Sequence, residues 1–187
     1  MYRLLHRRNT RSVVVLHGLG GMGKTQLALK YIRRYKEKYT AIFWLNANDE
    51  DSLRLSFRDI AQQILEHHPS INILASINLD EKLDQVVKAV KAWLKIPKNM
   101  RWLMIFDNYD NPRNTNNPDS SAVDVRQFLP GCDHGSIIIT TRSSQVSQGR
   151  RIQVQKLPNI QDGLEILSNI SGRKGIENGM SFGICLM

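Results

Sequence analysis

The chain has 187 residues, of which 41% are hydrophobic, so it is long enough to build one α/β domain around a sizeable core. The formal net charge of +9 attracts polyanions in general, but the basic residues are scattered and accompany no nucleic-acid-reading motif, so no specific nucleic-acid partner is predicted. The two cysteines, Cys132 and Cys185, form no CxxC pair, and no apolar run approaches membrane-spanning length. These features indicate neither a disulfide framework nor a zinc site nor a membrane partner, and they favour the reducing cytoplasm.

The first segments predict a strand that leads into a helix. Residues 1–11 are basic and contain no acid, and we expect them to form an exposed N-terminal arm. Residues 12–17 (SVVVLH) are a β-branched run that ends at glycines, which is typical of a buried parallel strand. Residues 24–39 repeat apolar side chains at helical spacing, which predicts an amphipathic helix.

A glycine-rich segment joins this strand to this helix. Residues 18–25 (GLGGMGKT) match the phosphate-loop pattern GxxxxGK[ST] in full. Glycines let the backbone wrap tightly with N–H groups directed at an anion, and the helix start adds the positive end of its dipole. We expect Lys24 to contact the β- and γ-phosphates and Thr25 to offer its hydroxyl to Mg²⁺. The predicted nucleotide contacts here are Gly18, Gly20, Gly21, Met22, Gly23, Lys24, Thr25 and Gln26.

The rest of the chain repeats the alternation of strand and helix. Residues 41–45 (AIFWL) predict a second buried strand, and Asn48 and Asp49 are suited to cap the helix that follows. A polar loop separates that helix from a second amphipathic helix over residues 80–95. The later expected elements are strands at 101–106, 135–140 and 151–155, a surface loop at 108–121, and helices at 122–128 and 162–170.

Alternating strands and helices predict a parallel sheet that is covered by helices on both faces. Ligands of such sheets bind at the carboxyl ends of the strands. Asp107 directly follows the third predicted strand, and Arg142 follows the fourth, so both side chains are expected beside the glycine loop.

The chemistry of these two side chains suits a nucleotide site. The Asp107 carboxylate is expected to hold Mg²⁺ together with Thr25, whereas the alternative is an acidic turn residue. The guanidinium of Arg142 is expected to detect the γ-phosphate, whereas the alternative is a surface salt bridge.

Hydrolysis is less well supported by the sequence than binding. Asn108 stands where many ATPases carry a second acid that polarises water, and an amide cannot accept a proton as a carboxylate does. Asp110 is an alternative acid, so Asp107 and Asp110 are the candidate catalytic residues of what is at most a slow Mg²⁺-dependent ATPase.

The segments HGLGGMGKTQLALKY, AIFWLNA, WLMIFDN and GSIIITTR, in this order, resemble the NB-ARC domain of signal-transducing P-loop NTPases, the STAND class. The fungal type is the most similar. The resemblance covers about residues 12–171. It implies a three-layer P-loop NTPase fold with a mostly parallel five-stranded sheet of strand order 5-1-4-3-2. It also implies a cytoplasmic molecular switch in signalling or innate immunity that holds ADP at rest and ATP when active.

The resemblance assigns the phosphates to residues 20–25, Mg²⁺ to Asp107 and the γ-phosphate sensor to Arg142. It implies a nucleotide-binding domain over residues 12–173 that works with fused or partner signalling domains, or as a homo-oligomer. The Leu157-Pro158 pair resembles the family segment that leads into a helix. From residue 174 to 187 the chain stops resembling the family, and the second lobe of the family is not found, so we expect a truncated gene product or a mis-predicted end.

Two other functions fit parts of the sequence. An active P-loop ATPase or small-molecule kinase would share the glycine loop, and rapid ATP turnover would distinguish it. A nucleic-acid-binding protein would use the net charge, and its binding would depend steeply on salt. The matched motifs read phosphates and not the base, so they do not separate ATP from GTP.

Overall fold

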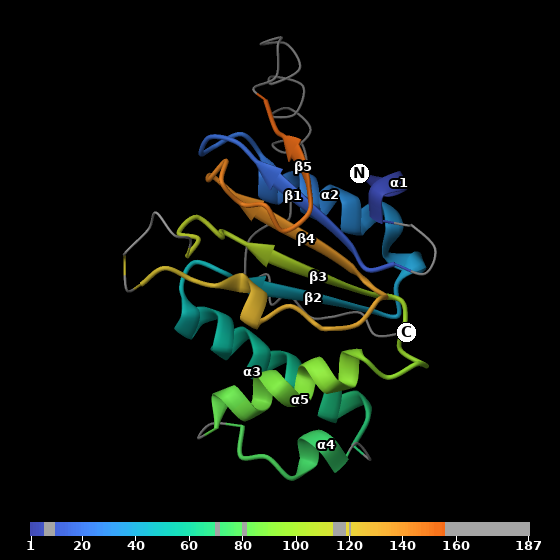
Figure 1. Cartoon of the computed structure of the whole chain (residues 1–187). Helices are drawn as coiled ribbons and strands as arrows, with labels where there is room; N and C mark the ends of the chain where they lie inside the picture. The colour runs from blue at the N-terminus through green and yellow to red at the C-terminus, as the bar shows by residue number, and fades with distance from the viewer. Residues whose placement is uncertain (6–9, 70–71, 80–81, 114–118, 120, 156–187) are drawn as a thin grey trace, which may run out of the picture.

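A computed structural model describes residues 1–5, 10–69, 72–79, 82–113, 119 and 121–155 of the chain. Five strands form one sheet, and helices lie against it (Figure 1). The strands are β1 (Ser12–His17), β2 (Ala41–Asn46), β3 (Trp102–Asp107), β4 (Ser136–Thr141) and β5 (Arg150–Gln153). The α-helices are α1 (Tyr2–Leu5), α2 (Lys24–Tyr35), α3 (Glu50–His67), α4 (Asn72–Ala75) and α5 (Leu83–Leu94), and the 3-10 helices are η1 (Lys36–Lys38) and η2 (Val125–Gln127).

The sheet is parallel, and its strand order is β2-β3-β4-β1-β5. This is the expected order 5-1-4-3-2 read from the other side, so the predicted P-loop NTPase architecture is confirmed. The register pairs Val14 of β1 with Ile138 of β4, and Phe106 of β3 with Ile139 of β4. All strands end at the same edge, so the residues that follow β1, β3 and β4 come together there.

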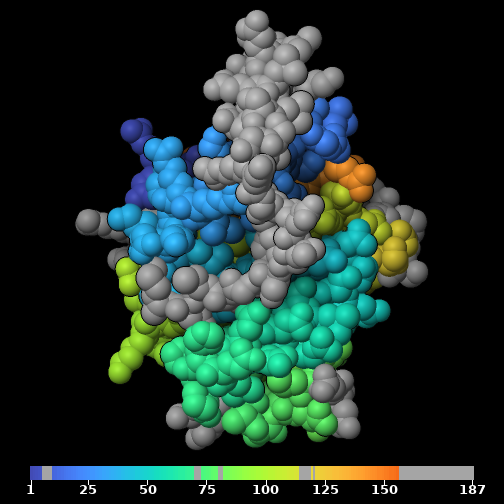
Figure 2. All heavy atoms as spheres, turned by 180° about the vertical axis from the view of Figure 1, so that it is seen from behind, coloured from blue at the N-terminus to red at the C-terminus, as the bar shows by residue number. Residues whose placement is uncertain are grey.

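The sheet separates two hydrophobic cores, and successive strand residues alternate between them. On one face, Phe43 and Met104 pack with the apolar sides of α3 and α5. On the other face, Leu16 and Ile105 pack with α1 and α2. Every residue of β3 and of β4 is buried, as expected for central strands with both faces covered. The fold therefore has three layers. In the view from behind, α2 (blue) and the helices α3 to α5 (cyan to green) occupy separate parts of the surface (Figure 2).

Several predicted helices differ at their ends. The helix expected over residues 24–39 ends as an α-helix at Tyr35 and continues as the 3-10 turn η1. The expected polar loop before α5 contains the short helix α4, and the helix expected over residues 122–128 is reduced to the 3-10 turn η2. Such short segments carry too few residues for a periodic pattern to decide their structure.

The expected N-terminal arm is exposed at Tyr2 and Arg3, but it is not a free arm over residues 1–5. They form α1, and the side chain of Leu5 is only 3% exposed in the core beside α2. The carbonyl oxygen of Leu5 accepts a hydrogen bond from the Ser136 hydroxyl at 2.9 Å, at the start of β4. The ring of Tyr2 stacks on the ring of Tyr35 of α2. One buried leucine in a basic segment was too weak a signal to predict this contact.

Among the described residues, no helix combines the length and the apolar character needed to cross a membrane. The expected helix over residues 162–170, the Leu157-Pro158 pair, the domain end at residue 173 and the segment 174–187 lie outside the described residues.

Candidate functional site

The glycine loop connects β1 to α2 at the carboxyl edge of the sheet. Gly21 and Gly23 have φ angles of +75° and +81°, which side chains with a Cβ adopt only with strain. At Gly18 an added Cβ would lie 2.5 Å from the carbonyl oxygen of Val154, so this position has no room for a side chain. The glycines of the motif are therefore required by backbone conformation at two positions and by close packing at a third.

The first turn of α2 is open toward the loop. Gly23 is the N-cap residue, no side chain of the described residues caps the helix by a hydrogen bond, and the first turn contains no acid. Unsatisfied amides and the positive end of the helix dipole make such a helix start a site for anions. The ammonium of Lys24 donates hydrogen bonds to the carbonyl oxygens of Gly18 and Leu19, at 2.8 Å and 2.9 Å, so it lies over the loop.

The other predicted loop contacts lie as follows. The Met22 sulfur is 3.5 Å from the position of a Cβ at Gly18, so this side chain covers the start of the loop. Gln26 is exposed in the first turn of α2. Arg142 approaches from β4, since its Cδ atom lies 3.8 Å from the position of a Cβ at Gly20.

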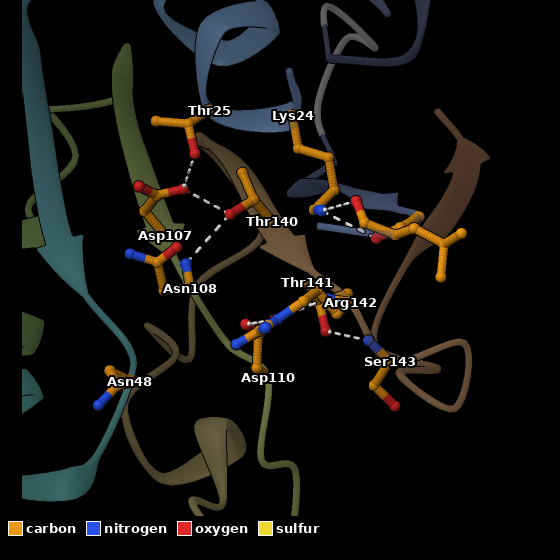
Figure 3. A network of polar contacts seen from close by, with 12 residues as sticks. Lys24, Thr25, Asn48, Asp107, Asn108, Asp110, Thr140, Thr141, Arg142 and Ser143 are labelled. Atoms are coloured by element: carbon orange, nitrogen blue, oxygen red, sulfur yellow. Dashed lines mark hydrogen bonds and ion pairs between the residues drawn. The ribbon is translucent and has the colours of Figure 1, made fainter. Parts of the chain in front are cut away.

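The carboxylate of Asp107 ends β3 and is buried, with 6% of the residue exposed. Its Oδ1 atom accepts hydrogen bonds from the hydroxyls of Thr25, at 3.0 Å, and of Thr140, at 2.5 Å (Figure 3). No lysine, arginine or histidine of the described residues forms an ion pair with it. A buried carboxylate that is faced by hydroxyls and not by a cation is suited to bind a metal ion.

Thr140 is part of this cluster although no sequence motif indicated a role for it. Its hydroxyl donates to Asp107 and accepts a hydrogen bond from the backbone N–H of Asn108 at 3.1 Å. Asn108 itself has a φ angle of +65°, a left-handed conformation that asparagine tolerates better than most residues. The available signal was a threonine at the end of an isoleucine-rich buried strand, where a polar side chain needs a partner.

The second predicted acid, Asp110, contacts Arg142 and not Asp107. Its Oδ1 atom accepts a hydrogen bond from the backbone N–H of Arg142 at 2.6 Å, and its Oδ2 atom accepts one from the Nε atom at 2.5 Å. The structure thus brings the predicted site residues to one edge of the sheet, but it places the two acids in separate clusters, Asp107 with Thr25 and Thr140 and Asp110 with Arg142 (Figure 3).

His17, which ends β1, adds little to the positive charge that Lys24 and Arg142 bring to this edge. Burial lowers the pKa of His17 below its ordinary value, and the nearby charge of Arg151 lowers it further. The imidazole therefore adds little positive charge at neutral pH.

The donor set fits Mg²⁺. Thr25 and Asp107 offer two oxygen ligands from facing elements, and Mg²⁺ in nucleotide sites takes one or two protein oxygens and completes its shell with phosphates and water. No group of three or more His, Cys, Asp or Glu side chains gathers among the described residues, so the protein part offers no closed cage for a metal ion.

A parallel sheet of this order, with a glycine loop between its first strand and an uncapped helix, defines a P-loop NTPase module. The family model of the NB-ARC domain matches residues 1–176. The chain belongs to the NB-ARC domain family.

The similar proteins agree with this assignment. A nucleotide-binding leucine-rich repeat (NLR)-like protein from Hyaloscypha variabilis is 30% identical over 142 residues, which are 72% of this chain and 13% of that protein. The chain thus spans only a small part of this relative. The crystal structure of Cdc6p from Pyrobaculum aerophilum has a similar fold, with a TM-score of 0.53 and 14% identity over 91% of this chain and 46% of that chain.

Proposed function

We propose that this chain is the nucleotide-binding regulatory module of a signalling NTPase, and that it acts as a switch between an ADP-bound and an ATP-bound state. The observation that carries the proposal is the open first turn of α2, which has neither a side-chain cap nor an acid and begins with Lys24. A diphosphate would find unsatisfied amides and one ammonium group there.

In this proposal the phosphates are surrounded by Gly18, Gly20, Gly21, Met22, Gly23 and Gln26. Lys24 moves its hydrogen bonds from the loop carbonyls to phosphate oxygens. Asp107 and the Thr25 hydroxyl hold Mg²⁺, which when bound neutralises phosphate charge. Arg142 contacts the γ-phosphate and so makes ATP differ from ADP. A ligand shifts a two-state equilibrium only by such a difference in contacts.

The proposed partners are an adenine nucleotide and signalling domains that are joined to the chain or assemble with it, as a homo-oligomer or otherwise, in the cytoplasm. The name of the NLR-like relative and its much greater length support this part of the proposal.

The test is calorimetric titration of the chain with ADP, ATP and GTP, with and without Mg²⁺. Lys24→Ala should reduce ADP affinity by at least about tenfold, because a charge-assisted contact to phosphate is lost. Lys30→Ala removes the same charge from an exposed position of α2 and should leave the affinity unchanged. Equal ADP affinity in the two variants would contradict the proposed site, provided that both unfold at the temperature of the unmodified chain.

Steady-state turnover separates a switch from an active enzyme. Asn108 offers no carboxylate, so we expect hydrolysis to be slow, with Asp107 contributing through the metal. Rapid ATP turnover, or phosphate transfer to a small molecule, would favour the ATPase or kinase alternative.

A further inference from the structure

Asp110 and Arg142 form a two-point contact across the carboxyl edge of the sheet. One carboxylate oxygen accepts the backbone N–H of Arg142 and the other accepts its Nε–H, at 2.6 Å and 2.5 Å. The two residues are 32 positions apart, so the contact joins the loop after β3 to the residue after β4 (Figure 3). Both oxygens of Asp110 are thus directed at Arg142.

The backbone next to Asp110 is firmly held. The preceding residue, Tyr109, is 1% exposed, and its hydroxyl donates a hydrogen bond to the carbonyl oxygen of Val123 at 2.9 Å. The backbone N–H of Tyr109 donates to the Thr140 carbonyl at 2.9 Å. The Asp110 carboxylate therefore extends from a fixed backbone, and its side chain is only 20% exposed.

The contact leaves the outer end of the guanidinium available. Asp110 binds Arg142 through Nε and the backbone, and within the described part of the chain neither Nη nitrogen of Arg142 has a hydrogen-bond partner. The Arg142 side chain is 64% exposed, and its Cδ atom lies beside Gly20 of the phosphate loop. A guanidinium has five N–H groups in one plane, so it can bind a carboxylate through Nε and a phosphate through Nη at the same time.

We propose that Asp110 is a positioning residue that holds Arg142 side-on, so that both Nη groups are presented to the terminal phosphate of ATP. This inference rests on the proposed function, because it requires Arg142 to be the γ-phosphate sensor. It assigns Asp110 to the discrimination between ATP and ADP and not to the activation of water.

The test is the ratio of ATP affinity to ADP affinity in Mg²⁺ for the unmodified chain and for Asp110→Asn, Arg142→Ala and the double variant. Asparagine keeps an oxygen that accepts the backbone N–H of Arg142, but its amide nitrogen cannot accept the Nε–H. We therefore expect Asp110→Asn to lower the ATP preference by about tenfold, the range of a lost charge-assisted hydrogen bond, with ADP affinity unchanged. Arg142→Lys should also lower it, because a single ammonium group cannot bind Asp110 with one edge and phosphate with another, as the planar guanidinium can.

The chain offers a matched control in Asp124 and Arg126. Oδ1 of Asp124 accepts hydrogen bonds from the backbone N–H and the Nε of Arg126, at 3.1 Å and 2.7 Å, and Oδ2 accepts one from Nη2 at 2.9 Å. Asp124→Asn weakens a similar contact between a carboxylate and a guanidinium and should leave the ATP preference unchanged. Thermal unfolding of each variant separates a loss of preference from a loss of folded protein.

The double variant decides the mechanism. If Asp110 acts through Arg142, adding Asp110→Asn to Arg142→Ala changes the ATP preference no further.

A rise of ATP affinity in Asp110→Asn would show competition for the guanidinium and overturn the proposal. An unchanged preference with abolished turnover would also overturn it and assign Asp110 as the base. If Arg142→Ala keeps the full ATP preference, the proposed sensor fails as well, so the two failures are distinguishable.

Discussion

Two helices begin at the carboxyl edge of the sheet, and their first turns differ. At α3, Asp49 accepts hydrogen bonds from the Ser52 backbone N–H at 2.7 Å and from the Ser52 hydroxyl at 2.8 Å, and Glu50 and Asp51 follow in the first turn. At α2, the N-cap is Gly23, no side chain caps the helix, and no acid follows. Side chains of the protein thus cap the first turn of α3, whereas no side-chain cap is found at the first turn of α2.

The difference in capping shows which of the two helix starts is suited to bind an anionic ligand. Acids at the start of α3 satisfy the amides and offset the helix dipole, so an anion gains little there. One acid does approach the start of α2, but it comes from another strand. Asp107 of β3 contacts the Thr25 hydroxyl and not the amides, which leaves the amides for phosphate and the carboxylate for a cation.

The largest effect on nucleotide binding should follow substitution of Asp107, the acid that faces α2. Asp107→Asn should abolish the Mg²⁺ dependence of ATP binding and lower the affinity in Mg²⁺ on the order of 100-fold, because a neutral amide is a poor ligand for this cation. The amide oxygen can still accept the hydroxyls of Thr25 and Thr140, so the unfolding temperature should not fall. Calorimetry with and without a chelator measures the effect. A variant that still gains affinity on addition of Mg²⁺ would remove Asp107 from the metal site.

A smaller effect is expected when α2 is given an acid like that of α3. Gln26→Glu places a carboxylate in the open first turn, where it should stabilise the helix by a few tenths of a kcal/mol and repel phosphate. We expect a loss of ADP affinity of about tenfold, which is about 1.4 kcal/mol. Gln62→Glu adds the same charge to an exposed position within α3 and is the control. Equal affinities in the two variants would mean that the start of α2 does not hold the phosphates.

The smallest effect should follow removal of the cap of α3. Asp49→Ala should lower the free energy of unfolding by about 1 kcal/mol and leave nucleotide affinity unchanged. Hydrogen bonds from Ser52 lower the pKa of Asp49 below its ordinary value of 3.8, so its contribution is present in full above that value.

This contribution is lost as the pH falls through the lowered pKa of the folded state. Urea unfolding at several pH values should therefore show a difference between the unmodified chain and Asp49→Ala that is constant near neutral pH. The difference should shrink below a pH of about 4. A difference that grows in acid would contradict this assignment.

The fold was predictable because its signals are local. The strand expected over residues 12–17 has those bounds in the structure. A β-branched run that is bounded by polar residues and glycines indicates a strand from a few neighbouring residues alone. The glycine loop is equally local. The strand order needed the family resemblance, because periodicity does not say which strands are neighbours.

Thr25 was expected beside Asp107 and contacts it, but the other side-chain partners at the site were not predictable from the sequence. Phe106 pairs with Ile139, so the next residues, Asp107 and Thr140, lie opposite each other, and this follows from the strand register and not from spacing. The contact of Asp110 with Arg142 depends in the same way on two loop conformations. Leu5 was missed because a single apolar side chain carries no periodicity.

The close packing at Gly18 has a mechanical consequence. Its N–H donates to the carbonyl of Thr141 on one side, at 3.3 Å, and on the other side the Val154 carbonyl leaves no space for a Cβ. The base of the loop is thus fixed between two neighbouring segments of backbone, while its far half has open space at Gly21 and Gly23. We therefore expect a change of ligand to displace Gly18 less than the loop residues nearest to α2.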